Sequence, residues 1–370
     1  MTQLLHAAQR RGVRGGPISG ANSHALDVAI RQVEVAEAGL DIRPFAPSEL
    51  RVDHDRVIAG PIEYRLSPDG LRRFCGWVGA PANYLTKLDS DIRSRLLQFH
   101  VDSRDYHRAP RRLTDANTAI ISRAGEFINL VRSDLALVPS TAVLGALKDG
   151  VGNDAASLRI QRFAINDERM QIDVVSPIQS EEVRPGDVVE AGIRMSHSMV
   201  GEFATSVSSY IHRLVCANGM THRECLGRQK TRTRRLGDQA GASQQQVEQI
   251  RRLVAMTWEG LHEKLAAIKR LQDQPIDDVE QGWRPFLTRA RMNSNRIVFL
   301  LRQAWHTEGR EPTAFGMLNA LTRVATHATE VSAMQRGILE RLAGVMAMAD
   351  VHLCPRCFNF VSERAVTSLN

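Results

Sequence analysis

The chain has 370 residues, 43% of them hydrophobic and 5% aromatic, with a formal net charge of +7. This composition argues against a disordered chain, and because no apolar run reaches the roughly 18 residues that span a bilayer, it also argues against a transmembrane helix. The first basic residues follow a short apolar stretch instead of preceding it, unlike a secretory signal, so we expect a cytoplasmic protein with reduced thiols.

The N-terminal part predicts an arm, a hairpin and two helices. We interpret residues 1–47 as a basic, partly flexible arm. Residues 48–66 alternate apolar and polar side chains around a Gly-Pro turn, which predicts a hairpin. Ser67 and Pro68 predict a helix start, because serine accepts amide hydrogen bonds there and proline suits the first helical position. Apolar spacing over 81–101 predicts one further helix.

The pattern changes to strand-like alternation between residues 117 and 217. Runs of alternating side chains are separated by turn residues, and a helix over 140–151, with Ser140 as its cap, interrupts them. This order is typical of an α+β fold with an antiparallel or mixed sheet and flanking helices, not of repeating βαβ units. We therefore predict an α+β domain over 48–226, and no glycine-rich nucleotide-binding loop follows any of its strands.

Helical periodicity dominates beyond residue 240. The segment 242–271 predicts one long amphipathic helix, and three more helices follow, the first of them over 279–306. Their leucine, valine and methionine stripes are typical of helix packing and not of a cofactor site. We predict a basic linker or strip at 227–238 and a helical region with a C-terminal CxxC tail at 239–370.

The segment 227–238 holds the densest run of positive charge. It is either a solvated linker or a phosphate-binding strip. Lysine and arginine that meet phosphates release counterions and bind without reading sequence, and other arginines lie nearby in the sequence, so we favour the strip. A genome that prefers arginine is the alternative source of the positive charge. The predicted nucleic-acid-binding residues are Arg213, Arg223, Arg228, Lys230, Arg232, Arg234 and Arg235.

The segment Tyr210–Cys225 raises the question of a cysteine site. Asn218 and Gly219 predict a turn after an apolar strand, because both residues accept positive φ. We expect Cys216, just before that turn, to be a small buried hydrophobe. A cysteine nucleophile needs a base within contact, and a zinc site in this segment lacks a fourth ligand.

The pair Cys354 and Cys357 has the CxxC spacing that suits zinc thiolate coordination. A complete site needs a second pair, and the sequence has no second CxxC. Cys216 and Cys225 could supply that pair only through the fold. Zinc at Cys354 and Cys357 is thus one interpretation, an inert pair is the other, and we expect no other cofactor.

The strand-like run around His197 has a polar side. Ser196, His197 and Ser198 resemble parts of a catalytic Ser-His pair. Adjacent residues of a strand project to opposite faces, so a direct Ser–His couple within this strand is disfavoured. A polar strand face that contacts phosphate or solvent is the favoured interpretation.

Two segments resemble a known family. The run SHSMVGEFATSVSSYIHRLVCANGM, residues 196–220, resembles the core signature of the phage- and plasmid-associated family called domain of unknown function 932. The run TAFGMLNALTRVATH, residues 313–327, resembles its C-terminal motif, and the resemblance covers about residues 110–330. It implies a link to mobile elements and hence to DNA metabolism, recombination or defence evasion, and it implies no residue roles.

We therefore predict a nucleic-acid-binding protein of a mobile element, without catalytic activity. We expect it to bind and anneal single-stranded DNA in recombination or repair, to form homo-oligomers and to have no membrane partner. Phage single-strand annealing proteins share a mixed sheet, a helix beside it and a basic strip, an analogy at the level of the fold. The few aromatic residues count against base stacking, which such grooves often use.

Two other functions remain open. The chain could be an enzyme on nucleic acid or nucleotides if polar residues of the sheet and of the helical region meet in one pocket. It could also be a structural or protein-interaction factor that docks through its helical region. The candidate residues of the enzyme alternative are Ser196, His197, Asn218, Asn319 and His327.

Overall fold

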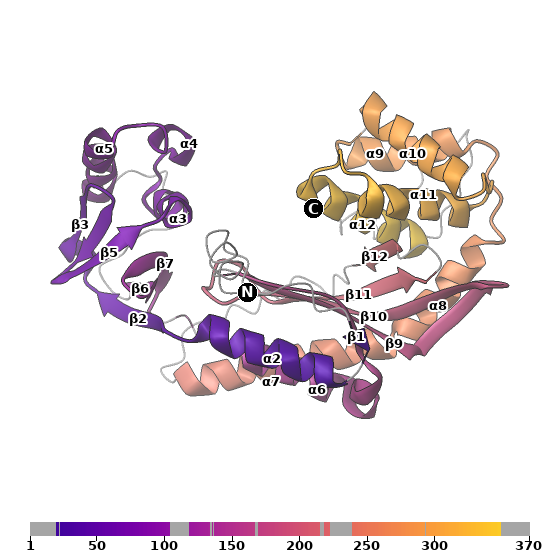
Figure 1. The fold of residues 1–370 in the computed structure, drawn as a ribbon, viewed down its shortest axis with the longest axis horizontal. Helices are drawn as coiled ribbons and strands as arrows, with labels where there is room; N and C mark the ends of the chain where they lie inside the picture. Colours follow the sequence, from indigo (N-terminus) through magenta and orange to yellow (C-terminus); the bar gives the residue numbers. More distant parts are fainter. Residues whose placement is uncertain are drawn as a thin grey trace, which may run out of the picture.

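Two six-stranded sheets organise the chain in the computed structural model (Figure 1). The α+β prediction is confirmed, with the sheets in the first two thirds and a helical region after them. The structure describes residues 20–21, 23–103, 118–133, 135, 137–166, 169–214, 218–222, 239–292 and 294–348.

The long sheet is antiparallel throughout and has the strand order β1-β8-β9-β10-β11-β12. Its central strands β9 and β10 are the longest, with 16 and 12 residues, and continue across Pro177 and Gly192. The strands are β1 (Gly20–Ala21), β8 (Arg159–Ile165), β9 (Arg169–Arg184), β10 (Asp187–Ser198), β11 (Ser206–Arg213) and β12 (Asn218–His222).

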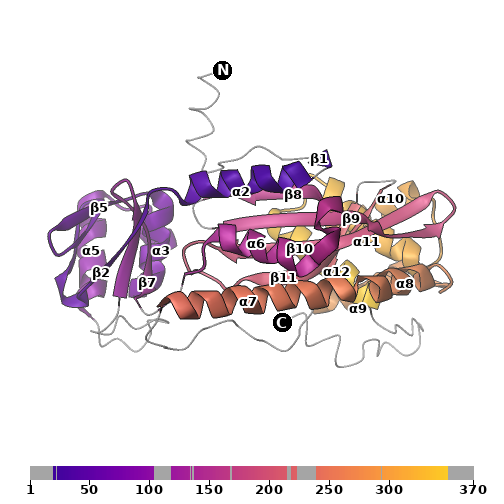
Figure 2. The same cartoon turned by 90° about the horizontal axis from the view of Figure 1, so that it is seen from below.

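Three helices cover one face of the long sheet. They are α2 (Ser23–Glu37), α6 (Ser140–Val151) and α7 (Gln239–Glu259), and Figure 2 shows them side by side on that face. Their apolar side chains pack on Ile172, Val174 and Ile193 from the strands, all of them buried. Because side chains of a strand alternate, the opposite face of the sheet carries the polar half of each strand.

The short sheet has the order β2-β6-β7-β5-β4-β3. All of its pairs are antiparallel except β5 with β7, which are parallel. Together with three helices it forms the N-terminal unit. The elements are β2 (Leu40–Phe45), a 3-10 turn (Pro47–Glu49), β3 (Leu50–Asp53), β4 (Arg56–Ala59), β5 (Ile62–Leu66), α3 (Pro68–Val78), α4 (Ala82–Leu85), α5 (Ser90–Asp102), β6 (Thr118–Arg123) and β7 (Glu126–Arg132).

The β6–β7 hairpin belongs to both hydrophobic clusters. Ile120 and Leu130 pack in the cluster of the N-terminal unit, whereas Ile121 and Val131 pack in the cluster of the long sheet. Asn129, in the same hairpin, is 2% exposed and bonds to both sides. Its Oδ1 accepts from the indole of Trp77 at 3.1 Å, and its Nδ2 donates to the carbonyl of Val200 at 2.9 Å.

The C-terminal helices sit at the other end of the long sheet (Figure 1). The helix α12 packs along the edge strand β12, α8 packs on β9, and α11 packs between α10 and α12. No helix among the described residues is both long enough and apolar enough to cross a membrane. The helices are α8 (Leu261–Leu271), α9 (Val279–Arg289), α10 (Asn295–Thr307), α11 (Ala314–His327) and α12 (Ala333–Met348).

The helix α3 begins where the sequence predicted it. The single helix expected over 81–101 is instead divided into two helices. The Oγ of Ser67 accepts from the amide of Gly70, with Pro68 in the first turn. The expected single helix is α4 and α5, because Asp89 caps a new start by accepting from the amide of Asp91 at 3.0 Å. Capping competes with continuation of a helix where a short acid can reach a free amide.

Two more expected helices are also divided. The segment 242–271 changes direction at Gly260, between α7 and α8. The segment 279–306 divides because Ser294 caps α10 by accepting from the amide of Ile297.

Ser140 is not the cap of α6. It is the first residue of that helix, Pro139 precedes it, and its Oγ has no hydrogen-bond partner among the described residues.

The turn predicted at Asn218 and Gly219 lies elsewhere. Both residues belong to β12 and pair with Arg213 and His212 of β11. The chain reverses between Arg213 and Asn218, so β11 ends earlier than the apolar run suggested.

Candidate functional site

Most of the predicted binding and metal residues lie outside the described part of the chain. This holds for the basic strip, for residues 1–19 of the arm predicted over 1–47, for both candidate cysteine pairs, and for the region that joins β12 to α7. The later part of that predicted arm forms β1, α2 and β2. Among the described residues no group of three or more histidine, cysteine, aspartate or glutamate side chains is placed to hold a metal ion. The residues outside are Cys216, Arg223, Cys225, Arg228, Lys230, Arg232, Arg234, Arg235, Cys354 and Cys357.

Cys75 is the cysteine that the described residues do contain, and it is buried and free. Burial raises the pKa of its thiol to about 11. The thiolate is the reactive form of cysteine, so Cys75 packs as an apolar side chain.

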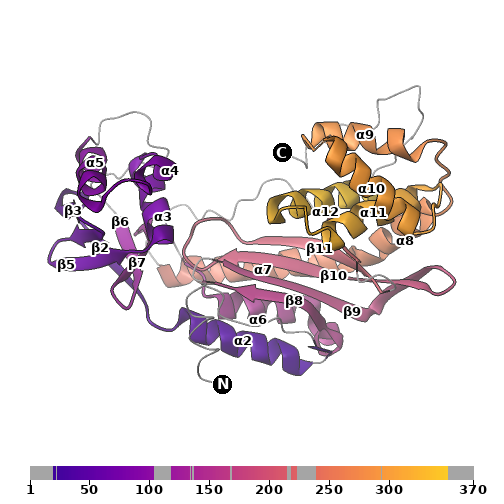
Figure 3. The ribbon, with the colours of Figure 1, turned by 45° about the horizontal axis from the view of Figure 1, so that its top comes forward.

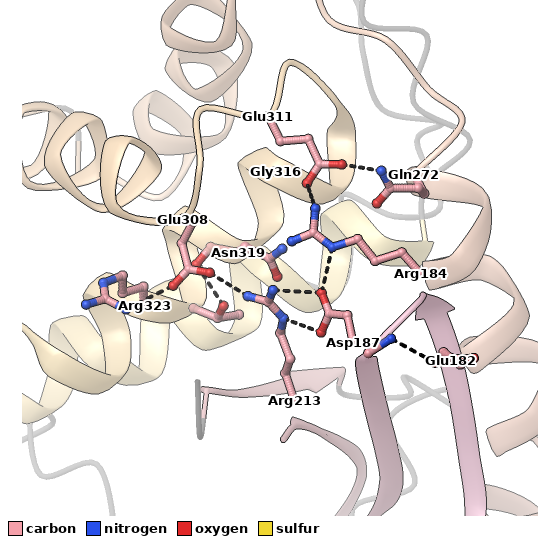
Figure 4. A network of polar contacts seen from close by, with 12 residues as sticks. Glu182, Arg184, Asp187, Arg213, Gln272, Glu308, Glu311, Gly316, Asn319 and Arg323 are labelled. Carbon is pink, nitrogen blue, oxygen red and sulfur yellow. Dashed lines mark hydrogen bonds and ion pairs between the residues drawn. The ribbon is translucent and has the colours of Figure 1, made fainter. Parts of the chain in front are cut away.

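Arg213 is buried in an ion-pair network at the end of β11 (Figure 4). Its side chain is 7% exposed, and its Nε and Nη2 donate to the two carboxylate oxygens of Asp187 at 2.7 Å each. Its Nη1 donates to Glu308 at 2.5 Å. These carboxylates already neutralise the buried guanidinium, which argues against a phosphate contact by Arg213.

The network continues through neighbouring side chains. Arg184 donates to Asp187 at 3.2 Å and to Glu311 at 2.9 Å, and Arg323 donates to Glu308 at 3.0 Å. Burial alone would lower the pKa of Arg213, but the hydrogen bonds to Asp187 and Glu308 more than offset it, so its pKa is raised. We call these six residues, Arg184, Asp187, Arg213, Glu308, Glu311 and Arg323, the arginine junction.

The arginine junction brings together the two segments that carry the family resemblance. Arg213 comes from residues 196–220, and its guanidinium lies 5.6 Å from the ring centre of Phe315, in residues 313–327. A small pocket beside it is lined by Arg213, Phe315 and Asn319 together with apolar side chains of β10, β11 and α8. The matched charges and full pairing indicate that the junction fixes α10 and α11 on the sheet.

His197 is held from two sides and is not free for catalysis. Its Nε2 lies 2.9 Å from the carbonyl of Val138, and its Nδ1 lies 2.8 Å from the hydroxyl of Thr205. A carbonyl only accepts, so Nε2 carries the proton and Nδ1 accepts from Thr205. Burial lowers the pKa of His197 to about 4, which keeps the imidazole neutral. Its role is to join β10 to the segment before α6.

The four residues of the enzyme alternative whose side chains the structure describes, Ser196, His197, Asn319 and His327, do not meet. Asn319 shares its pocket with Val189, which is eight residues from His197 on β10, about 26 Å along the strand. His327 is exposed, eight residues or about 12 Å along α11 from Asn319. The Oγ of Ser196 accepts from Arg169 at 3.1 Å, on the face opposite to His197. These positions therefore give no common pocket.

The polar side of the long sheet is continuous across four strands. Directly paired residues of antiparallel strands project to the same face. Arg194 pairs with Asp173 and with Ser208, and Glu190 pairs with His212. Figure 3 turns this face toward the reader, with α11 and α12 at one end of it. We call it the polar face, and its side chains include Arg159, Arg162, Arg169, Gln171, Asp173, Glu190, Arg194, Ser196, Ser208, Tyr210 and His212.

The acids of the polar face are buried, whereas two of its arginines reach solvent. The side chains of Asp173 and Glu190 are 0% and 4% exposed. Arg162 is 56% exposed, with its Nε 4.0 Å from Asp173, and Arg169 is also exposed. The solvent side of this face is therefore positive, because its acids are buried and its exposed charges are arginines.

Arginines of the polar face stack on aromatic rings. The guanidinium of Arg169 lies 5.6 Å from the ring centre of Phe203, an exposed side chain, and donates to Gln171 at 3.0 Å. The guanidinium of Arg194 lies 5.0 Å from the ring centre of Tyr210 and donates twice to Asp173 at 2.7 Å. Nucleobases stack on exposed aromatic and arginine planes. Of these two pairs, Arg169 with Phe203 is exposed, whereas Tyr210 is buried and Arg194 is also paired with Glu340 of α12.

The residues of the polar face that matter most were not among the predicted sites. A polar strand face around Ser196 was predicted from the sequence, but the arginines of β8 and β9 beside it were not. Arg162 and Arg169 stand at polar positions of alternating strands, which is the signal that could have found them. Comparison with models of known protein families, with curated proteins and with solved structures gives no match to this chain. The family resemblance thus stays a prediction from its two motifs.

Proposed function

We propose that the protein binds single-stranded nucleic acid, preferably DNA, along the polar face of the long sheet. The observation that carries this proposal is the arrangement of charge: the acids are buried, whereas the guanidinium groups of Arg162 and Arg169 are exposed on the solvent side of the face, where phosphates can reach them. Phosphate contacts supply sequence-independent affinity because each one releases condensed counterions.

The aromatic contacts support a single strand over a duplex. The bases of a duplex are stacked on each other, whereas those of a single strand are free to stack on protein side chains. Arg169 and Phe203 form an exposed pair of the kind that such bases use.

The biological role that we propose is annealing of single strands in recombination or repair of a mobile element, by a homo-oligomer without catalysis. The family resemblance supports the mobile element. The basic strip at 227–238 follows β12, the edge strand of the same sheet, in the sequence, so we assign it a second set of phosphate contacts.

The test is fluorescence anisotropy of a labelled single strand of mixed sequence, titrated over a series of salt concentrations. In the double variant Arg162→Gln and Arg169→Gln, we expect weaker binding and a salt slope reduced by about 1.4, since each single-strand phosphate contact contributes about 0.7. The matched control changes Arg56 and Arg65 of the short sheet, which are 61% and 74% exposed, to glutamine.

The control variant removes the same charge from a different surface. Equal loss of affinity in both variants would mean that net charge alone attracts the strand, and the polar face would then lose its role. A third variant with the five basic residues of the strip changed to alanine measures the contribution of 227–238. Failure of the unchanged protein to bind at low salt would remove nucleic acid as the ligand.

A further inference from the structure

Three buried polar groups on the polar face are incompletely paired. Arg159, Glu190 and His212 come from β8, β10 and β11, and Arg159 donates through Nη2 to Oε1 of Glu190. Among the described residues, the Nε of Arg159, the Oε2 of Glu190 and the Nδ1 of His212 have no hydrogen-bond partner. Each unpaired buried group costs about 1–3 kcal/mol, so the cluster is a costly arrangement for the free protein.

On one side of this cluster the strand pairing is irregular, and on the other side the facing residue is a glycine. The register of β9 against β10 shifts between Glu190 and Ala191, which leaves residues 177–179 bulged out of the ladder. Bulges of this kind often lie beside functional sites, where they redirect side chains. On the other side, His212 pairs with Gly219 of β12, a residue that brings no side chain next to the imidazole.

The members of the cluster differ in exposure. Glu190 is 3% exposed and His212 is 9% exposed, whereas the side chain of Arg159 is 30% exposed and forms the outer layer. Burial, and then the positive charge of Arg159, lower the pKa of His212, so its ring is neutral and its nitrogens can both accept and donate. Rotation of Arg159 toward solvent would uncover an acceptor on Glu190 and a neutral imidazole.

We propose that this cluster is a nucleobase site that Arg159 closes in the free protein. The inference rests on the proposed binding of single strands to the same face. On binding, Arg159 exchanges Glu190 for a backbone phosphate. Glu190 then accepts a hydrogen bond from the exocyclic amino group of a base, and His212 donates to the ring nitrogen beside that amino group. The site therefore reads bases that carry an amino group next to a ring acceptor.

Cytosine and thymine separate the site from general strand binding. They are pyrimidines of similar size, but cytosine presents an amino group where thymine presents a carbonyl. A carboxylate accepts from the amino group and repels the carbonyl. A specific contact of this kind discriminates by 1–3 kcal/mol, so we expect oligo(dC) to bind about tenfold more tightly than oligo(dT).

The experiment measures the anisotropy of labelled 12-mers of oligo(dC) and oligo(dT), at one salt concentration, on the full chain. In Glu190→Gln the preference should vanish, because an amide can rotate to donate to thymine as well as accept from cytosine. In Arg159→Lys the ion pair persists but the Nε donor is lost, and the affinity for both strands should fall. Arg162→Lys, on the same strand and face, is the matched control and should keep the preference.

The outcomes separate the two proposals. Equal binding of oligo(dC) and oligo(dT) by the unchanged protein would overturn the nucleobase site and leave strand binding intact. Binding of neither would overturn both. The comparison between strands needs no variant, so it stands even if Glu190→Gln unfolds, which far-UV circular dichroism would show.

Discussion

Arg213 shows that a positive residue in a basic neighbourhood can serve the fold alone. It precedes the basic strip in the sequence, yet its guanidinium already donates hydrogen bonds to Asp187 and Glu308 and lies over the ring of Phe315. The sequence alone cannot distinguish an arginine that is paired with acids from distant elements from an arginine that is exposed and able to bind a phosphate. Only the fold brings Asp187 and Glu308, from positions 26 and 95 residues away, to the same guanidinium.

His197 makes the stability of the protein depend on pH. Its pKa is about 4 in the folded chain and near 6.5 when unfolded. Between these two values only the unfolded chain binds the proton, so the free energy of unfolding decreases as the pH falls through this window. The decrease contributed by this residue is about 3 kcal/mol, and no more is lost below pH 4.

Urea denaturation at pH 7.5, 6 and 5 measures this effect. The variant His197→Gln should be less stable at pH 7.5 and should lose less stability on acidification than the unchanged protein. The exposed His262 of α8 offers a control, and His262→Gln should leave the pH dependence as it was. An identical slope in His197→Gln would show that other groups cause the acid sensitivity.

The helix α6 contains two glycines, Gly145 and Gly150, and only Gly150 lies against α7. A Cβ at Gly150 would lie 2.6 Å from Val254 and 2.7 Å from the carbonyl of Arg251, both on α7. A Cβ at Gly145, on the same helix, would meet nothing within 4 Å. Gly150 therefore permits the close approach of α6 and α7 under the long sheet, whereas Gly145 has no part in that contact.

Alanine at these two positions should therefore have opposite effects. Gly150→Ala should cost about 1–3 kcal/mol of unfolding free energy, because α7 must move away. Gly145→Ala should gain about 0.5–1 kcal/mol, since alanine favours a helix over glycine. Chemical denaturation of both variants provides the comparison, and a loss at Gly145 as large as that at Gly150 would contradict the packing argument.

The elements were more predictable than their ends. Period-two alternation located β8 to β11, and the Ser67 cap located α3. The apolar pattern continues across Asp89, Gly260 and Ser294, and hydrophobic periodicity cannot detect a helix end where the pattern continues. The helices divided at these residues were therefore expected to be continuous. Likewise an Asn-Gly pair favours a turn locally, yet pairing with β11 keeps Asn218 and Gly219 in a strand.

The site was harder to predict than the fold. A polar strand face near Ser196 follows from alternation alone. The partnership of Arg159 with Glu190 and His212 depends on the strand order and on a bulge, and neither can be obtained from one strand at a time. The charge of a face is a property of four strands together, so counting charges in the sequence drew attention to the strip instead.

The β6–β7 hairpin makes the two halves of the molecule depend on each other. One of its faces completes the core of the N-terminal unit, and the other completes the core beneath the long sheet. Exposure of either core would leave apolar side chains of the hairpin in water. We therefore expect one cooperative unfolding transition, although chains of this length often unfold in steps.

Differential scanning calorimetry tests this expectation. A single peak with equal calorimetric and van't Hoff enthalpies is the expected result. The variant Asn129→Ala, which removes the hydrogen bonds of Asn129 to the indole of Trp77 and to the carbonyl of Val200, should lower the transition temperature. Two resolved peaks in the unchanged protein would mean that the hairpin does not couple the cores.

The helix α2 has a further consequence for how the chain is made. It packs on β8 and α6, so its partners are synthesised after the whole N-terminal unit. From the end of α2 at Glu37 to the start of β8 at Arg159 the ribosome adds roughly 120 residues, which takes about 6–24 s at 5–20 residues per second. During that interval the apolar side of α2 lacks β8, and the N-terminal unit that emerges in between is the first part able to collapse. A nascent chain stalled before residue 159 therefore presents α2 as a segment for chaperones to bind.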